Sequence, residues 1–152
     1  MKHSLKWAGA VWLVLLLSMP AAADDLLMAR ANRMFPEAMT LLQSAISSRG
    51  YTVTRLQQVN ENLQRREFQS DMYRVVYFGK LEEVRRATAR NPDLIPFLPL
   101  NITIFAEGDQ SILVASHPQM LQEFFPDPEL KALFERWGKD MVEIMDEVRE
   151  EK

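Results

Sequence analysis

The sequence predicts an α+β fold, a two-layer sandwich in which helices cover one face of a mostly antiparallel sheet. Apolar residues recur with helical spacing in three segments, and short segments rich in β-branched and aromatic residues lie between them. Two of the predicted strands are separated only by the tight turn Gly108-Asp109, which indicates a hairpin. Hairpin-linked strands pair antiparallel, and a single covered face gives two layers.

The N-terminal 23 residues indicate a cleavable secretory signal peptide. Lys2 and Lys6 precede an apolar run of 11 residues. Three alanines then precede Asp24 in the small-residue pattern that signal peptidase requires. A membrane-spanning helix needs roughly 20 apolar residues, so this run is too short to anchor the chain. We therefore expect a bacterial protein that is periplasmic or secreted, with no membrane contact after cleavage of residues 1–23.

The mature chain is expected to be acidic, and it contains no cysteine. Without Lys2 and Lys6 it keeps 16 basic and 21 acidic residues, a net charge of −5. This charge argues against a nucleic-acid partner, which would require a basic surface, and against docking on anionic lipid. The lack of cysteine excludes disulfides, thiolate metal sites, covalent haem attachment and a cysteine nucleophile. We expect no cofactor.

The first half of the chain predicts strands on both sides of one helix. Pro36 fits the first turn of that helix, and Gly50 fits the position after its end. The segments after Gly50 are rich in Val, Thr, Tyr and Phe, which favour strands. The resulting elements are a short strand at 26–31, a helix at 36–49, strands at 51–59 and 72–78, and a polar loop or short surface helix at 60–71.

The second half predicts a helix followed by the hairpin. Leu81, Val84 and Thr88 share one face of the helix, and Asn91-Pro92 ends it. Apolar and polar residues alternate on both sides of Gly108-Asp109, as in strands with one buried face. The resulting elements are a helix at 80–90, a buried irregular connector at 93–99, and hairpin strands at 100–107 and 110–116.

The last helix, assigned to the C-terminal segment 127–152, follows the α+β domain at 24–126. Asp127 caps the helix and Pro128 occupies its first position. Its apolar residues are spaced alternately by four and three, which gives a narrow seam: Leu130, Phe134, Trp137, Met141, Ile144 and Val148. Amphipathic helices usually pack within their own chain. The alternative is docking on a partner subunit through Phe134, Trp137 and Met141.

Several features of the sequence resemble a known bacterial family. The stretch from Asn91 to Phe105 enters a strand through Leu98-Pro99, and it is followed by Gly108 and by His117-Pro118. This pattern is similar to the bacterial domain-of-unknown-function family 302 (DUF302). The resemblance implies a two-layer fold of the TATA-binding-protein-like class and a homodimer, and it supplies no activity. Many members carry a cysteine where this chain has Leu100, so no role of that thiol transfers.

The sequence is best interpreted as a small exported binding or accessory domain that is not an enzyme. A curved sheet under helices can hold a small apolar ligand. The alternatives are a structural subunit of a periplasmic complex docked through the C-terminal helix, a His117-dependent enzyme, and a metal-binding protein. The predicted ligand-lining residues are Phe97, Leu98, Ile102, Ile104, Ile112, Val114 and His117.

His117 is the only histidine of the mature chain and therefore the natural candidate for proton chemistry. The simpler interpretation is an exposed turn residue, because no partner is evident from the sequence. A copper site would join His117 to methionine thioethers at Met120, Met141 and Met145, but methionine more often fills gaps in a core, so no metal is expected. The acidic residues weighed as a catalytic pair are interpreted as solvated surface: Asp71, Glu82, Glu83, Glu107 and Asp109.

Overall fold

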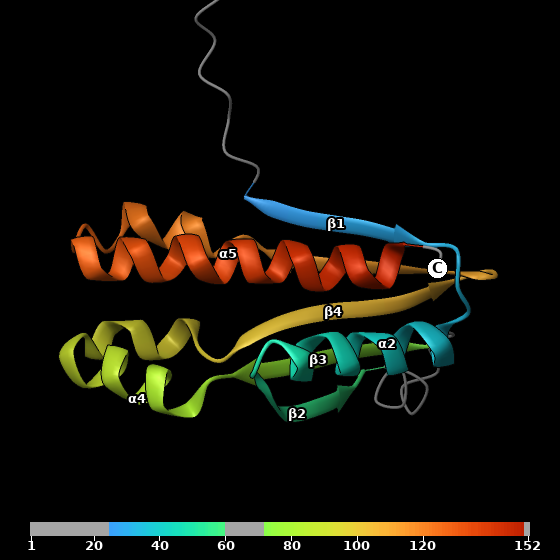
Figure 1. Ribbon diagram of the computed structural model, residues 1–152, viewed down its shortest axis with the longest axis horizontal. Helices are drawn as coiled ribbons and strands as arrows, with labels where there is room; N and C mark the ends of the chain where they lie inside the picture. Colours follow the sequence, from blue (N-terminus) through green and yellow to red (C-terminus); the bar gives the residue numbers. More distant parts are fainter. Residues whose placement is uncertain (1–24, 60–71, 151–152) are drawn as a thin grey trace, which may run out of the picture.

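The computed structural model describes residues 25–59 and 72–150, which form a five-stranded sheet and its helices (Figure 1). The predicted signal peptide at 1–23 and the predicted polar segment at 60–71 lie outside the described residues. The elements in chain order are β1 (Leu26–Ala31), α2 (Phe35–Ser48), β2 (Thr52–Gln58), β3 (Tyr73–Gly79), α4 (Leu81–Arg90), the 3₁₀ helix η1 (Pro92–Phe97), β4 (Leu100–Glu107), β5 (Gln110–Ser116), the 3₁₀ helix η2 (Pro118–Glu123) and α5 (Pro128–Arg149).

The sheet is antiparallel throughout, with strand order β1-β5-β4-β3-β2. The hairpin of β4 and β5 pairs Glu107 with Gln110 across a two-residue turn. Gly108 in this turn has φ of +60°, a conformation that glycine adopts without a steric cost. The predicted α+β fold with a mostly antiparallel sheet and a C-terminal helix is therefore confirmed.

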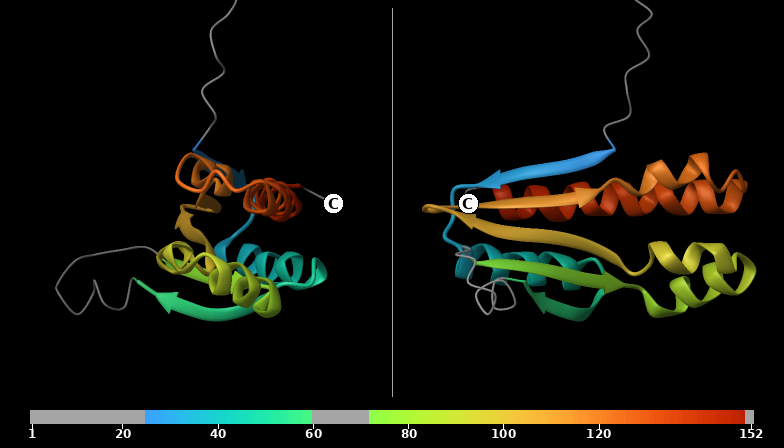
Figure 2. Two further views of the ribbon diagram at one scale, coloured as in Figure 1. Left: turned by 90° about the vertical axis from the view of Figure 1, so that its left-hand side faces the viewer. Right: turned by 180° about the vertical axis from the view of Figure 1, so that it is seen from behind.

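The helices α2 and α5 lie side by side on one face of the sheet (Figure 2). Side chains alternate across a strand, so every second residue points toward these helices. Ile102 and Ile104 of β4 face them and are fully buried. Thr103, between them, pairs with Val114 on the opposite face. The main core therefore lies between the sheet and the pair of helices.

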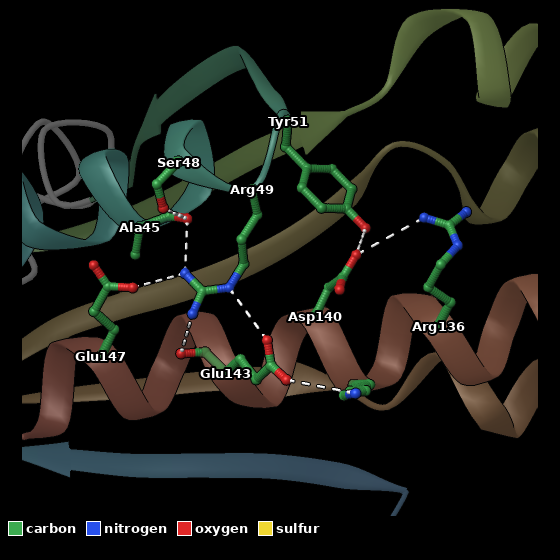
Figure 3. Close-up of polar contacts among 9 residues, drawn as sticks. Ala45, Ser48, Arg49, Tyr51, Arg136, Asp140, Glu143 and Glu147 are labelled. Atoms are coloured by element: carbon green, nitrogen blue, oxygen red, sulfur yellow. Dashed lines mark hydrogen bonds and ion pairs between the residues drawn. The ribbon is translucent and has the colours of Figure 1, made fainter.

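Arg49, at the end of α2, links the two covering helices (Figure 3). Its guanidinium donates to the carbonyl of Ala45 at 3.1 Å and to Glu147 at 2.7 Å, and its Nε lies 3.6 Å from Glu143. The side chain is mostly buried, so these charge-assisted bonds are less screened than a surface ion pair. They fix the C-terminal end of α2 against α5.

The apolar seam of α5 packs within its own chain. All six predicted seam residues are buried, and Trp137 is only 1% exposed. One of the two predicted arrangements assigned a partner interface to Phe134, Trp137 and Met141. These side chains face the chain's own core and present no surface to a partner subunit. No helix within residues 25–59 and 72–150 is long and apolar enough to cross a bilayer.

The connector at 93–99 differs from the prediction. It was expected to be buried and irregular, but most of it forms η1, in which Leu94 is buried while Ile95 and Phe97 are exposed. A 3₁₀ helix has three residues per turn, so Ile95 turns away from the side on which Leu94 is buried. Phe97 lies on the same side as Leu94, one turn later, and is only partly covered.

Candidate functional site

An apolar hollow of about 430 Å³ lies beside α4, at the end of the sheet where β3 terminates. The helix α4 supplies one wall, η1 and the following residues supply a second, and the strands β2 and β3 close the third. The lining residues are Thr54, Gly79, Leu81, Val84, Thr88, Ile95, Leu98 and Pro99.

The sequence of α4 explains why the hollow exists. Leu81, Val84 and Thr88 share one helical face, as predicted, but this face lines the hollow and does not pack into the core. Leu81 is 65% exposed. Within α4, every residue of which the structure describes, only Ala87 is buried. The apolar face of α4 is thus left available to a ligand.

Gly79 allows α4 to lie close to the end of β3. A Cβ atom at this position would be 3.3 Å from Cγ2 of Val84 and 4.0 Å from Cβ of Pro99. The first distance is tighter than ordinary van der Waals contact, so a larger residue would push on the wall of the hollow. The absence of a side chain at Gly79 therefore helps to keep the hollow open.

The seven predicted lining residues do not form one surface. Leu98 lines the hollow. Ile102 and Ile104 are buried beneath the helices, whereas Ile112 and Val114 lie on the opposite face of the sheet. The alternation of each strand was predicted correctly, but the two strands place these pairs on different faces.

Phe97, another predicted lining residue, belongs to a row of aromatic rings. Its ring stacks on Phe124 at a centroid distance of 6.5 Å and meets Phe125 edge-on at 5.9 Å. Phe125 contacts Phe134, which contacts Trp137. The row connects η1 to the core of α5, so Phe97 contributes to the attachment of η1.

His117, the last predicted lining residue, is held by local structural contacts. Its Nδ1 accepts a hydrogen bond from the backbone N–H of Gln119 at 3.1 Å, which caps η2. Its ring lies against α5 at Gly138, where a Cβ atom would be 2.4 Å from Cε1 of the imidazole. Within residues 25–59 and 72–150, no hydrogen bond or ion pair joins His117 to a carboxylate.

The described part of the chain brings no cluster of His, Asp or Glu side chains together as a metal site. Residues 25–59 and 72–150 contain no group of three or more His, Cys, Asp or Glu side chains placed to hold an ion. Met141 and Met145, weighed as copper ligands, are buried on the apolar side of α5. Both methionines therefore fill the core, in agreement with the simpler interpretation of the sequence.

A polar network that the sequence did not reveal links α4 to α5. Glu83 accepts hydrogen bonds from Arg136 and, at 2.7 Å, from Nε1 of Trp137. Arg136 lies 3.8 Å from Asp140, which in turn accepts a bond of 2.5 Å from the Tyr51 hydroxyl (Figure 3). Glu83 was interpreted as solvated surface, but its side chain is only 16% exposed. Its partners lie more than 50 residues away, so no local pattern marks it.

Burial raises the pKa of Tyr51 far above its ordinary value near 10, and the adjacent Asp140 carboxylate raises it further. Because the pKa of Tyr51 is higher in the folded than in the unfolded chain, the unfolded chain loses this proton first as the pH rises. Tyr51 therefore contributes fully to the free energy of unfolding below pH 10, and this contribution is lost at higher pH. We expect the free energy of unfolding to fall above pH 10 by up to about 1.4 kcal/mol per pH unit from this group.

The Tyr51→Phe variant removes this dependence. It loses the bond to Asp140, so we expect it to be about 1 kcal/mol less stable at pH 7 but less sensitive to alkali than the wild type. Urea unfolding between pH 7 and 11.5 measures both effects. The control is Tyr77→Phe, because the Tyr77 hydroxyl donates to the neutral side-chain amide of Gln57 at 3.3 Å and, among the described residues, to no carboxylate. Equal alkaline slopes in wild type and Tyr51→Phe would refute the assignment.

Comparisons with known proteins agree with this fold. The sequence profile of the family described as "Domain of unknown function DUF302" matches residues 28–148. The crystal structure of an uncharacterized conserved protein DUF302 from Bacillus stearothermophilus superposes with a TM-score of 0.75 at 21% identity, covering 84% of this chain and 100% of that one. No curated protein matches significantly. Because the profile spans most of the chain and the resemblance seen in the sequence is confirmed, the protein belongs to the DUF302 family.

Proposed function

We propose that this protein is an exported, non-enzymatic binding module that takes a small apolar ligand in the hollow beside α4. The observation that carries the proposal is the hollow itself, whose volume of about 430 Å³ lies within the range typical of small-molecule sites. The wall of the hollow includes the exposed side chain of Leu81. An apolar ligand that covers this side chain removes it from water, which is favourable.

The polar groups of the hollow support an apolar ligand. Among the described lining residues, Thr54 and Thr88 supply the side-chain hydroxyls. Each donates to a backbone carbonyl, Thr54 to Tyr77 at 3.2 Å and Thr88 to Val84 at 2.9 Å. Neither hydroxyl hydrogen is left for a bound molecule, so a hydrogen-bond acceptor on a ligand would lose its bond to water without replacement from these side chains. An apolar ligand avoids this cost.

Export is proposed from the N-terminal sequence. The basic start, the apolar run and the three alanines before Asp24 fit a cleaved signal peptide. The first strand begins at Leu26, so cleavage there would remove no element of the described fold. Recovery of the protein from the periplasm with Asp24 as its first residue is the outcome that N-terminal mass analysis should give.

The alternatives have less support. His117 contacts Gln119 and the backbone at Gly138 and has no carboxylate partner within the described ranges, so an enzyme built on it lacks its second group. The buried seam of α5 disfavours a subunit that docks through Trp137. The homodimer implied by the family resemblance stays a prediction, and it would need a surface other than this seam.

Binding can be tested with N-phenyl-1-naphthylamine, a neutral apolar dye whose fluorescence rises in apolar surroundings. We expect the wild type to bind it and Leu81→Ser to bind about tenfold more weakly, because part of the apolar contact area is lost. The matched control is Met28→Ser on β1, since Met28 is also 65% exposed but lies on the opposite edge strand from β2. Neither exposed residue should change stability by more than about 0.5 kcal/mol.

The result decides the proposal in either direction. Weaker binding in Leu81→Ser together with unchanged binding in Met28→Ser places the dye in the hollow. An equal effect of the two substitutions, or no binding to the wild type, refutes the site. Native mass spectrometry of protein purified from periplasm then reports whether an apolar molecule copurifies, and it gives the stoichiometry of the protein at the same time.

A further inference from the structure

The helix α4 has open space on two of its sides. The apolar hollow lies on one side. On the other side a polar cleft of about 620 Å³ separates α4 from the N-terminal part of α5. The cleft is lined by Glu83, Arg86, Ala87, Ala89, Arg90, Asn91, Asp127, Glu129, Leu130 and Leu133. Figure 1 shows α4 and η1 together at one end of the molecule, beyond the sheet. The helix is therefore a thin wall between two cavities.

Apolar packing holds α4 only weakly. Ala87 is its single buried side chain, and alanine buries little surface. The neighbouring η1 differs, because Leu94 is fully buried and Phe97 joins the aromatic row. Movement of α4 therefore costs less apolar contact than movement of η1, and the contacts that keep α4 in place must be mainly polar.

Glu83 supplies the strongest of these polar contacts. Its two carboxylate oxygens are used separately, one by Arg136 and one by Nε1 of Trp137. Trp137 is fixed in the core, and Arg136 is also held near Asp140. Both donors are therefore held in position before α4 meets them. Charge-assisted bonds of this kind are stronger than neutral ones.

The other polar contacts of α4 are weaker. Arg90 pairs with Glu129 at 2.6 Å, but both side chains are more than 70% exposed, and exposed pairs contribute little. Glu82, next to Glu83, pairs with Arg85 on its own helix at 3.0 Å and so fixes α4 to nothing else. Within residues 25–59 and 72–150, Glu83 is thus the main polar link between α4 and the body of the protein.

We propose that Glu83 is a latch, a contact that holds α4 against α5, and that α4 is the movable wall of the apolar hollow. When its bonds to Arg136 and Trp137 break, α4 is free to move away from β3 while η1 stays anchored through Leu94. This movement displaces Leu81, Val84 and Thr88 together and widens the hollow, so that a ligand enters it more easily. The role of this movement in ligand entry rests on the proposed binding function, whereas the role of Glu83 in holding α4 does not.

Hydrogen–deuterium exchange of the full chain tests the latch. The matched variants are Glu83→Ala and Glu82→Ala, which remove the same side chain from adjacent positions in the first turn of α4. We expect amide exchange in residues 81–90 to accelerate about tenfold or more in Glu83→Ala relative to Glu82→Ala, with α2 unchanged in both. If Glu83→Ala does not fold, Glu83→Gln removes the charge with little change in shape and should give a smaller acceleration.

The association rate of N-phenyl-1-naphthylamine tests the gate. We expect faster association with Glu83→Ala than with Glu82→Ala. Equal exchange of α4 in the two variants overturns the latch. Faster exchange with an unchanged association rate overturns the role of α4 as the gate. Faster exchange in a protein that binds no dye leaves the latch standing and refutes the proposed binding function, so the two failures are distinguishable.

Discussion

Replacing Trp137 with alanine is expected to lower the free energy of unfolding by about 3–5 kcal/mol. The side chain is 1% exposed, packs against Phe134 at a ring-centroid distance of 5.8 Å, and donates its indole N–H to Glu83. The substitution removes a large apolar group, leaves a cavity, and deprives a mostly buried carboxylate of one donor. Denaturant unfolding followed by circular dichroism measures the loss, since removal of tryptophan changes the fluorescence signal.

Two further variants separate the causes of this loss. Trp137→Phe keeps most of the ring volume and loses the bond to Glu83, so it should cost only about 1–2 kcal/mol. Phe124→Ala removes an aromatic ring that is 63% exposed and should cost less than about 1 kcal/mol. The intramolecular role of Trp137 would be refuted if Trp137→Ala kept the wild-type stability and instead lowered the molecular mass measured by light scattering.

The parts of the fold that local signals determine were predictable from the sequence. The strands at 26–31, 100–107 and 110–116 occur at the predicted positions, and α5 begins at Pro128 after its Asp127 cap. The other predicted helices and strands within the described residues differ by one or two residues at their ends. Hairpin turns, helix caps and apolar periodicity act within a few residues of the chain, so they are visible without the tertiary structure.

The site was less predictable because periodicity shows which residues share a face but not what lies opposite. The apolar face of α4 was recognised, yet its residue Leu81 covers a hollow and not the core. Likewise, Ile112 and Val114 share one face of β5, but the register with β4 sets them opposite the face that Ile102 and Ile104 occupy. Only the arrangement of strands and helices in space decides these cases.

Contacts between distant residues could not be predicted from one sequence. Glu82 and Glu83 are identical in type and adjacent in the chain, yet one bonds within its own helix and the other reaches Arg136 and Trp137. The direction of each side chain around α4 follows from helical geometry. Which direction meets α5 depends on packing across the polar cleft, and this packing has no local signature in the sequence.

The contact between His117 and Gly138 predicts that Gly138→Ala lowers the stability of the wild type but raises the stability of a variant without the imidazole. A Cβ atom at Gly138 would be 2.4 Å from Cε1 and 3.1 Å from Nδ1 of the His117 imidazole. The ring must move to accept it, so Gly138→Ala is expected to destabilise the protein by about 1–3 kcal/mol. This occurs although alanine favours a helix interior over glycine by about 1 kcal/mol.

Removal of the imidazole should reverse the effect. Serine at position 117 can keep the acceptor that caps η2 through Gln119 while leaving space at Gly138. In the His117→Ser background, Gly138→Ala is therefore expected to stabilise the protein by up to about 1 kcal/mol. Unfolding of the wild type, the two single variants and the double variant by urea gives the coupling energy directly. A loss of equal size in both backgrounds would show that the imidazole is not the obstacle.

If the double variant also binds N-phenyl-1-naphthylamine like the wild type, the role of His117 is to pack against α5 and cap η2, and dye binding in the hollow does not depend on it.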